Sequence, residues 1–505
     1  MANPLYDRLF GRHAGQDTPF LHLPDGSTLT HAEFLGIAAR FAHVLSDAGL
    51  SPGDRLAAQV QKSPEALALY AACVQAGIVF LPLNTAYTVD ELTYFIENSG
   101  AALVICDGAS ETSLAPVASS LGARLMTLDA DGTGSLPERA ARMRTAFDTV
   151  DCAPDDLAAF LYTSGTTGRS KGAMLTQKNL LSNAETLAEH WRFTPDDVLL
   201  HALPIFHTHG LFVATNVTLA GGGSMIFLPK FDQDAVIAAL PGATVMMGVP
   251  TFYTRLLDDP RFTKELVSHM RLFVSGSAPL LSETHVRFED RTGHRILERY
   301  GMTETNMNTS NPYEGERRAG TVGKPLPGVE LKITDPDTGR EVQQGEVGQI
   351  EVRGPNVFKG YWQMPDKTAA ELRADGFFIT GDLGVVDEDG YVTIVGRNKD
   401  LIISGGYNIY PKEIELILDD QPGVMESAVI GVPHPDFGET VVGVLVPEPG
   451  QSPDLDAIQA AAGRSLARFK HPRKLIVLDE LPRNTMGKVQ KNQLREAYKD
   501  LFVTA

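Results

Sequence analysis

Helix-forming stretches alternate with short runs of β-branched residues along much of the chain, and this alternation restricts the fold more than any other feature. The pattern occurs as 65–75 then 78–81, as 91–98 then 103–106, and as 234–240 then 244–248. Such alternation is typical of βα units around largely parallel sheets. The sequence therefore predicts an α/β fold.

The pattern changes near Val329. Strand-like segments with Gly and Asp turns follow at 346–354 and 387–395, which predicts hairpins or a small barrel. After 396–400, about a hundred residues mix strands with helices, and a segment of that length is the size of a domain. We therefore expect a multi-lobed N-terminal domain over 1–398, with a small barrel-like lobe, and a smaller α+β domain over 399–505.

Composition and charge exclude several classes of function. The 505 residues include 44 basic and 63 acidic ones, which gives a net charge of −19. This charge opposes broad attraction to nucleic-acid phosphates or anionic lipid. No secretory signal is evident, and the most apolar stretch, 66–83, contains Gln75, Gly77 and Pro82, so no membrane span is expected. The three cysteines form no CxxC pair, which fits a reducing cytoplasm.

The segment 161–172, Leu-Tyr-Thr-Ser-Gly-Thr-Thr-Gly-Arg-Ser-Lys-Gly, carries the strongest chemical signal. Its glycines allow backbone N–H groups to turn inward, and hydroxyls and a lysine add donors and charge. Such a cradle suits polyphosphate, although an ordinary polar turn is the alternative. Because Lys171 is followed by Gly172 and the glycine spacing differs, the segment is not a Walker A loop.

Two further segments place carboxylates beside turns. Glu304 ends Tyr-Gly-Met-Thr-Glu, and one carboxylate with phosphate oxygens is a usual way to hold Mg²⁺. Asp382 lies between two glycines, where it can accept both hydroxyls of a ribose, and Arg397 can add a second contact. For Glu304 alone, a merely solvated side chain remains an alternative. The same applies to Lys488 in the loop Leu-Pro-Arg-Asn-Thr-Met-Gly-Lys.

These four segments, in this order, resemble the adenylate-forming acyl-CoA synthetases, and the resemblance covers about residues 25–495. The segments 201–210, 298–310 and 482–488 look like the malonyl-CoA synthetase branch. The resemblance implies a ligase in which a carboxylate attacks Mg·ATP to give acyl-AMP and pyrophosphate. The thiol of coenzyme A then displaces AMP.

The resemblance also implies roles for individual residues. The β- and γ-phosphates would be held by Thr163, Ser164, Gly165, Thr166, Thr167, Gly168 and Lys171. Mg²⁺ would be positioned by Glu304 and Thr163. The adenine and α-phosphate side would be lined by Ser277, Ala278, Pro279, Arg299, Tyr300, Gly301, Met302 and Thr303. Asp382 and Arg397 would bind the ribose, and Lys488 would bridge the α-phosphate and the substrate carboxylate.

The C-terminal domain is expected to move. In the resembling family it rotates, here about Lys399, and Ser404, Gly405 and Gly406 would then border the channel for pantetheine. Residues 464–474 hold six basic or histidine side chains and no acid, so we expect Arg468 and Lys470 to contact coenzyme A. A solvated helix end is the alternative reading of this segment. Lys488 is also a candidate for a lysine acetyltransferase and a deacetylase, because acetylation removes its charge.

In the resembling family the motif that here begins at Tyr300 borders the acyl pocket, so the acid is predicted from the preceding residue, Arg299. A buried guanidinium is costly beside a fatty or aromatic acid, but it can bind the second carboxylate of malonate in two parallel hydrogen bonds. His207, Thr208, Ser277 and Met307 would keep the pocket short, and methylmalonate would be tolerated. The alternative for Arg299 is a structural pair with Glu298 or with another carboxylate of the protein.

Other functions remain open at this stage. The enzyme could use acetate or propionate as its acid or, more distantly, an aryl or fatty acid. The chain could also be a non-catalytic module that binds ATP or acyl-CoA. His207 and His209 invite a metal reading, but no matching ligand spacing supports it. Residues 221–223 lack a dinucleotide-binding pattern and are expected to form a strand-to-strand turn.

Overall fold

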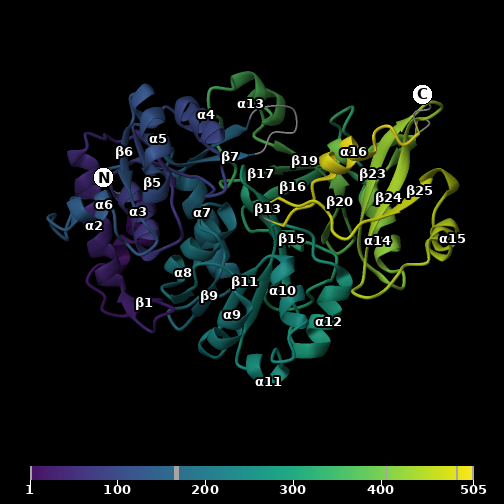
Figure 1. The fold of residues 1–505 in the computed structure, drawn as a ribbon, viewed down its shortest axis with the longest axis horizontal. Helices are drawn as coiled ribbons and strands as arrows, with labels where there is room; N and C mark the ends of the chain where they lie inside the picture. The colour runs from purple at the N-terminus through teal and green to yellow at the C-terminus, as the bar shows by residue number, and fades with distance from the viewer. Residues whose placement is uncertain (1–2, 164–169, 405–406, 485–486, 503–505) are drawn as a thin grey trace. The chain divides into compact units, whose positions relative to one another are not determined.

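The computed structural model describes residues 3–163, 170–404, 407–484 and 487–502. The chain divides into two compact units (Figure 1). The N-terminal unit comprises Met1–Glu330 and Val352–Phe378, and the C-terminal unit comprises Leu331–Glu351 and Ile379–Ala505. These compact units are defined by contacts within the chain and give no information on movement. The domain boundary and the hinge at Lys399 therefore stay predictions.

One sheet of the N-terminal unit includes the two neighbouring strands that flank the predicted phosphate-binding segment. Its strands are β3 (Arg55–Gln59), β4 (Val79–Pro82), β5 (Leu103–Cys106), β6 (Arg124–Thr127), β7 (Leu157–Thr163), β8 (Lys171–Thr176) and β18 (Gly360–Tyr361). Their order is β18-β8-β7-β4-β3-β5-β6. Strands β7, β4, β3, β5 and β6 run parallel, while β8 pairs antiparallel with both β7 and β18.

A larger sheet of the same unit has parallel strands in its middle and antiparallel strands at its ends. Its strands are β1 (Pro19–His22), β2 (Thr28–Thr30), β9 (Val198–His201), β10 (Ser224–Phe227), β11 (Val245–Gly248), β12 (Leu272–Ser275), β13 (Leu297–Met302), β14 (Asn306–Ser310) and β15 (Lys324–Pro325). The order is β15-β14-β13-β12-β11-β9-β10-β1-β2. The C-terminal ends of β12 and β13 lead into the predicted nucleotide and acyl segments.

Helices connect and cover these strands, as expected for βα units. They are α1 (Pro4–Leu9), α2 (His31–Asp47), α3 (Pro64–Gln75), α4 (Val89–Ser99), α5 (Gly108–Ser120), α6 (Ser135–Ala140), α7 (Gln177–His190), α8 (Asn216–Gly221), α9 (Gln233–Ala239), α10 (Pro250–Leu257), α11 (Lys264–Val267), α12 (Ser282–Thr292) and α13 (Pro365–Glu371). Capping boxes at Thr30, Thr88 and Thr176 define where α2, α4 and α7 begin. Figure 1 shows α9, α10 and α12 gathered beside β11. Side chains of these elements share a hydrophobic core that includes Tyr253 and Phe288.

The C-terminal unit is rich in antiparallel strands. One sheet has the order β16-β17-β19-β20, and another has β22-β21-β24-β23 with β25 paired to β24. The strands are β16 (Glu330–Thr334), β17 (Gly348–Arg353), β19 (Phe378–Val386), β20 (Val392–Arg397), β21 (Ile402–Ser404), β22 (Tyr407–Ile409), β23 (Val424–His434), β24 (Gly438–Pro447) and β25 (Lys474–Val477). The helices are α14 (Pro411–Asp419), α15 (Leu455–Ser465) and α16 (Lys491–Tyr498).

Strand β24 is apolar on both faces because each face packs on a separate core. Val441 and Leu445 belong to a core with residues of α14 and α15, whereas Val442, Val444 and Val446 belong to a core with Leu494 of α16. Side chains alternate between faces along a strand, so a continuous apolar run indicates burial on both sides.

The structure confirms the α/β class and most elements expected from the sequence. The helix at 65–75 is α3, and the strand at 103–106 is β5. The prediction for 221–223 is wrong: Gly221 ends α8, and Gly222 adopts a left-handed conformation that caps this helix before β10 begins. Within the described residues the three cysteines are free and buried, and no helix combines the length and apolar composition needed to cross a bilayer.

Candidate active site

Strands β7 and β8 bring the two ends of the predicted phosphate segment together. Thr163 is paired with Lys171 across the two strands. The predicted binding residues between these two positions, Ser164, Gly165, Thr166, Thr167 and Gly168, lie outside the described residues. Lys171 therefore begins a strand, and its side chain is fixed by neighbours on other elements.

The ammonium of Lys171 lies between Tyr361 of β18 and Glu371 of α13. Its Nζ donates to the hydroxyl of Tyr361 at 3.0 Å and to the two carboxylate oxygens of Glu371 at 3.1 and 3.3 Å. It also lies 4.1 Å from the centre of the Tyr361 ring. Both side chains of the ion pair are largely buried, at 16% and 22% exposure for Lys171 and Glu371. The pair is therefore less screened than a surface ion pair.

Glu304 lies in the turn after β13 and is buried. Its backbone carbonyl accepts from the N–H of Phe358 at 2.8 Å, and Tyr361 Oη lies 3.0 Å from its Oε1. The structure thus brings Glu304, Tyr361, Glu371 and Lys171 into one cluster.

The residues around Glu304 fit the way Mg²⁺ is usually held with a nucleotide. The described residues contain no group of three or more His, Cys, Asp or Glu side chains that could hold a metal alone. Mg²⁺ commonly uses one or two carboxylates together with phosphate oxygens and water. A buried carboxylate close to the Thr163–Lys171 end of β7 and β8 suits that arrangement.

Arg299 of β13 is a buried cation. It is 4% exposed, and its Nε and Nη2 have no hydrogen-bond partner in the part of the chain that the structure describes. Burial lowers the pKa of its guanidinium to about 9, and Tyr253 partly opposes this shift. The neighbouring Gly276 leaves room for it, because a Cβ at 276 would lie 2.6 Å from Arg299 Nε.

Glu298 does not pair with Arg299. Its carboxylate lies 3.4 Å from His285 Nδ1 on α12, and both residues are buried. Consecutive residues of a strand point to opposite faces, which accounts for this separation. The pair between Arg299 and Glu298 that the sequence left open is therefore wrong, and no carboxylate of the described residues bonds Nε or Nη2 of Arg299.

Ser277 and His209 form a polar contact after β12 that the sequence did not indicate. The Oγ of Ser277 lies 3.1 Å from Nδ1 of His209, and Ser277 has a φ of +74°, an uncommon value for a residue with a Cβ. Burial and the charge of Arg299 hold the pKa of His209 well below its usual range. His209 is therefore neutral at physiological pH. The charge of Arg299 contributes to this lowered pKa, which shows that the two side chains interact electrostatically.

The other predicted acyl-pocket residues are also buried or partly buried. Burial lowers the pKa of His207 to about 4, and its Nε2 and the Oγ1 of Thr208 have no partner in the described residues. A π-helix over His209–Thr215 follows them, a form often found at functional sites. Met307 of β14 is 2% exposed. No metal-binding group involves these histidines within the described chain.

The remaining predicted nucleotide residues lie on β13 and after β12. Tyr300, Gly301 and Met302 end β13, and Thr303 follows them. Gly301 is required sterically, because a Cβ there would overlap the carbonyl oxygen of Asn306. Ala278 is partly exposed, and Pro279 is exposed.

In the C-terminal unit, the structure brings Asp382 and Arg397 together. They are paired across β19 and β20, and Arg397 Nε lies 2.7 Å from Asp382 Oδ1. Lys488 lies in a loop and is exposed as a residue. Its pKa is lowered to about 8, by desolvation of the ammonium and by the charges of Arg397 and Lys399, against the opposing charges of Asp382 and Asp400.

The predicted contacts for coenzyme A are only partly described. Ser404 ends β21, whereas Gly405 and Gly406 lie outside the described residues. Arg468 is exposed in a 3₁₀ turn, while Lys470 forms an ion pair with Glu413 at 2.7 Å. Arg468 is thus the more accessible of the two cations.

Tyr361, Glu371 and Gly276 are the site residues that sequence reasoning missed, and His209 was considered there only as a metal ligand. Tyr361 and Glu371 lie 190 and 200 positions from Lys171, and neither belongs to a motif recognised in the sequence. Only the adjacency of Gly276 to Ser277 offered a local signal.

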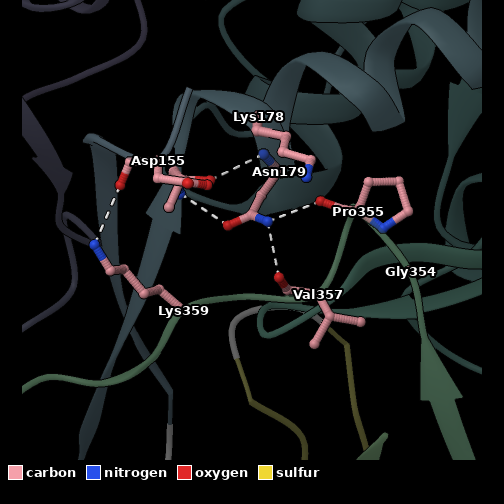
Figure 2. Close-up of a pocket in the computed structure, with 8 residues that line it drawn as sticks. Asp155, Lys178, Asn179, Gly354, Pro355, Val357 and Lys359 are labelled. Atoms are coloured by element: carbon pink, nitrogen blue, oxygen red, sulfur yellow. Dashed lines mark hydrogen bonds between the residues drawn. The ribbon is translucent and has the colours of Figure 1, made fainter. Parts of the chain in front are cut away.

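A groove at the start of α7 contains none of the site residues named above (Figure 2). It is lined by Asp155, Thr176, Lys178, Asn179, Gly354, Pro355, Val357 and Lys359. The amide of Asn179 donates to the carbonyls of Pro355 and Val357, each at 2.8 Å, and Lys359 donates to the carbonyl of Asp155. These bonds hold the 354–359 segment against α7, so we regard the groove as structural.

Comparison with known proteins gives consistent matches along the chain. Residues 11–362 match the AMP-binding enzyme family, and residues 413–488 match the AMP-binding enzyme C-terminal domain. The chain is similar to the crystal structure of ATP-bound MatB from Rhodopseudomonas palustris, with a TM-score of 0.97 and 59% identity over 99% of this chain and 100% of that one. It is 37% identical to a feruloyl-CoA synthase of Amycolatopsis sp, over 94% of each chain. It is 36% identical to a malonate–CoA ligase of Arabidopsis thaliana, over 89% of this chain and 79% of that protein.

Proposed function

The chain belongs to the AMP-binding enzyme family, and from this premise we propose that it joins malonate to coenzyme A in two steps, through malonyl-AMP. The likeness to a malonate–CoA ligase supports this proposal, but a feruloyl-CoA synthase is equally similar. The choice of acid therefore rests on the site and not on the similarity.

The single observation that carries the choice of malonate is the unpaired edge of Arg299. Nε and Nη2 lie on the same edge of the guanidinium, and both lack a partner in the described residues. Two parallel N–H donors match the two oxygens of a carboxylate. The second carboxylate of malonate would supply the missing anion and leave the first free to react.

Other acids fit this edge less well. Acetate and propionate have one carboxylate, which the reaction consumes, so Arg299 would stay unpaired. A fatty or aromatic acid would bury an apolar group against the cation, which is strongly unfavourable. Ser277 and the neutral His209 add polar groups near Arg299 and favour a small, polar acid. Methylmalonate differs by one methyl group and would be accepted, with Thr208 and Met307 limiting larger substituents.

In the first step, a malonate oxygen attacks the α-phosphorus of ATP, and pyrophosphate leaves. Phosphoryl transfer depends mainly on positioning and charge neutralisation. Lys171 would bind the polyphosphate, and Lys488 would neutralise the attacking carboxylate and the α-phosphate. Glu304 and Thr163 would hold Mg²⁺, which would neutralise phosphate charge. Asp382, fixed by Arg397, would accept hydrogen bonds from the ribose.

In the second step, the thiol of coenzyme A attacks the malonyl carbonyl carbon, and AMP leaves with the electron pair of the acyl–oxygen bond. We propose that the part of the chain after Lys399 turns between the two steps. Lys488 would then serve only the first step, and Ser404 with Arg468 and Lys470 would serve the second. Acetylation of Lys488 would remove its charge and stop the first step.

The test is CoA-dependent release of AMP from ATP with a panel of acids: malonate, methylmalonate, acetate, propionate, octanoate and ferulate. We expect the highest kcat/KM with malonate, and at least about 30-fold less with acetate, because the second carboxylate would contribute roughly 2 kcal/mol or more. A higher value for any monocarboxylate would contradict the proposal. ATP binding without AMP release for any acid would indicate a non-catalytic binding module.

A further inference from the structure

Two residues outside the recognised motifs connect the cation and the carboxylate of the phosphate site. We propose that Tyr361 and Glu371 are positioning residues that hold Lys171 and Glu304 in the arrangement that receives the polyphosphate of ATP. This inference rests on the proposed function, in which Lys171 binds phosphate and Glu304 is the carboxylate beside it.

Within the described residues, the contacts of Lys171 leave one donor for a ligand. An ammonium carries three N–H groups. Glu371 and Tyr361 lie within 3.0–3.3 Å of Nζ and can occupy two of them, while the ring of Tyr361 covers one side at 4.1 Å. A long, flexible side chain is thereby held in one orientation before ATP arrives, which lowers the entropy lost on binding.

Tyr361 connects Lys171 to Glu304 through its hydroxyl group. Tyr361 Oη accepts from Lys171 and lies 2.6 Å from Glu371 Oε2 and 3.0 Å from Glu304 Oε1. A tyrosine hydroxyl can accept one hydrogen bond and donate another at the same time. Its single hydrogen can serve only one carboxylate at a time, and the shorter contact is with Glu371.

Glu371 is fixed from a second side by Lys367, one helical turn earlier on α13. Lys367 Nζ lies 2.8 Å from Glu371 Oε1. Burial acts to raise the pKa of Glu371, but the hydrogen bonds from Lys367, Tyr361 and Lys171 lower it, so the residue is ionised. Because Lys367 retains this carboxylate when Lys171 also contacts a phosphate, Glu371 acts as an anchor and need not be displaced.

The first test is Tyr361→Phe, which removes the hydroxyl and keeps the ring, including its edge contact with Phe358. We expect the KM and the calorimetric Kd for MgATP to rise roughly tenfold, the size expected for one hydrogen bond to a charged group. The KM for malonate should change less than about twofold. Formation of malonyl-CoA from supplied malonyl-AMP should be unchanged, because that step involves no polyphosphate.

The second test is Glu371→Gln, which keeps the shape and removes the charge. We expect weaker binding of MgATP, and of ATP in the presence of EDTA, because Lys171 loses its anchor in both cases. The matched controls are Tyr70→Phe, which removes another buried tyrosine hydroxyl, bonded to Asn216, and Glu185→Gln, which breaks an ion pair with Arg8. Both controls should leave the Kd for ATP unchanged, even if Tyr70→Phe lowers the melting temperature.

Unchanged binding of MgATP in both site variants would overturn the inference. Tighter binding of ATP in Glu371→Gln would also overturn it, because Glu371 would then be a competing anion and not an anchor. Calorimetry tests this inference separately from the proposed function. Even if the protein releases no AMP with any acid, the Kd for ATP of the two variants still shows whether Tyr361 and Glu371 position Lys171.

Discussion

His285 Nδ1 lies 3.4 Å from the carboxylate of Glu298. Glu298 precedes Arg299 in the sequence, but its carboxylate faces His285 and does not pair with Arg299. Strand β13 points the two consecutive side chains to opposite faces. Among the described residues, Arg299 is thus left as a buried cation with an unpaired edge, and the assignment of malonate depends on that edge.

Arg299→Ala should lower kcat/KM for malonate by roughly 30- to 5,000-fold, because a charge-assisted contact to a desolvated carboxylate is worth about 2–5 kcal/mol. Arg299→Lys should recover only part of this loss, since an ammonium cannot form the two parallel hydrogen bonds. Residual turnover of acetate should fall much less. If the two acids lost activity in proportion, Arg299 would be serving ATP or the fold.

Gly276→Ala should reduce malonate activation while leaving ATP binding nearly intact. The added Cβ would overlap the guanidinium of Arg299, which must then shift. We expect a loss in kcat/KM of about tenfold or more, because buried sites tolerate an extra methyl group poorly. The matched control is Gly36→Ala, whose new Cβ would make only ordinary contacts. Gly122→Ala would not serve, because Gly122 has a positive φ. Equal effects of both substitutions would count against the steric explanation.

Much of the fold was predictable because its signals are local. The alternation at 65–75 and 78–81 identified α3 and β4, and that at 91–98 and 103–106 identified α4 and β5. In the site, Lys171, Glu304 and the pair Asp382–Arg397 were found from short motifs, and the structure brings Asp382 and Arg397 within 2.7 Å.

What the sequence could not indicate depends on contacts between distant elements. Glu371 lies on α13, 200 positions after Lys171, and no local pattern connects them. The contact between His209 and Ser277 likewise follows from the packing of the π-helix against the end of β12. The turn at 221–223 was misread because a glycine cap after a short helix has the same composition as a turn between strands.

Lys488→Ala should abolish formation of malonyl-AMP and largely spare thioester formation from supplied malonyl-AMP. The physical reason is that its charge is needed where a carboxylate attacks a phosphate, and the thiol step has no such requirement. Lys488→Gln, which imitates acetylation, should behave the same way. Equal losses in both half-reactions would place Lys488 in the fold or in both steps.

The rate of malonyl-AMP formation should fall as pH rises above about 8. The pKa of Lys488 is lowered to about 8, so its charged form predominates below that pH and is lost above it. The decline should approach tenfold per pH unit if the charged form alone is active. Lys488→Arg keeps its charge throughout this range, so its rate should show no such decline above about pH 8. An identical profile for both proteins would remove Lys488 as the titrating group.

Arg468→Gln should raise the KM for coenzyme A several-fold, about the effect of losing one exposed phosphate contact, and leave the KM for ATP unchanged. Lys470→Gln should have a smaller effect, because Glu413 already engages Lys470. Lys499→Gln, on an exposed pair with Glu496, is the control and should change neither KM. A rise in the KM for ATP of the same size would assign the cations to another role.

The most direct measurement for the central claim is a crystal structure with malonate and a non-hydrolysable ATP analogue. We predict that one malonate carboxylate accepts hydrogen bonds from both Nε and Nη2 of Arg299, with the other carboxylate directed to the α-phosphate. A structure in which Arg299 contacts the nucleotide, or in which malonate is absent from Arg299 at saturating concentration, would contradict the account.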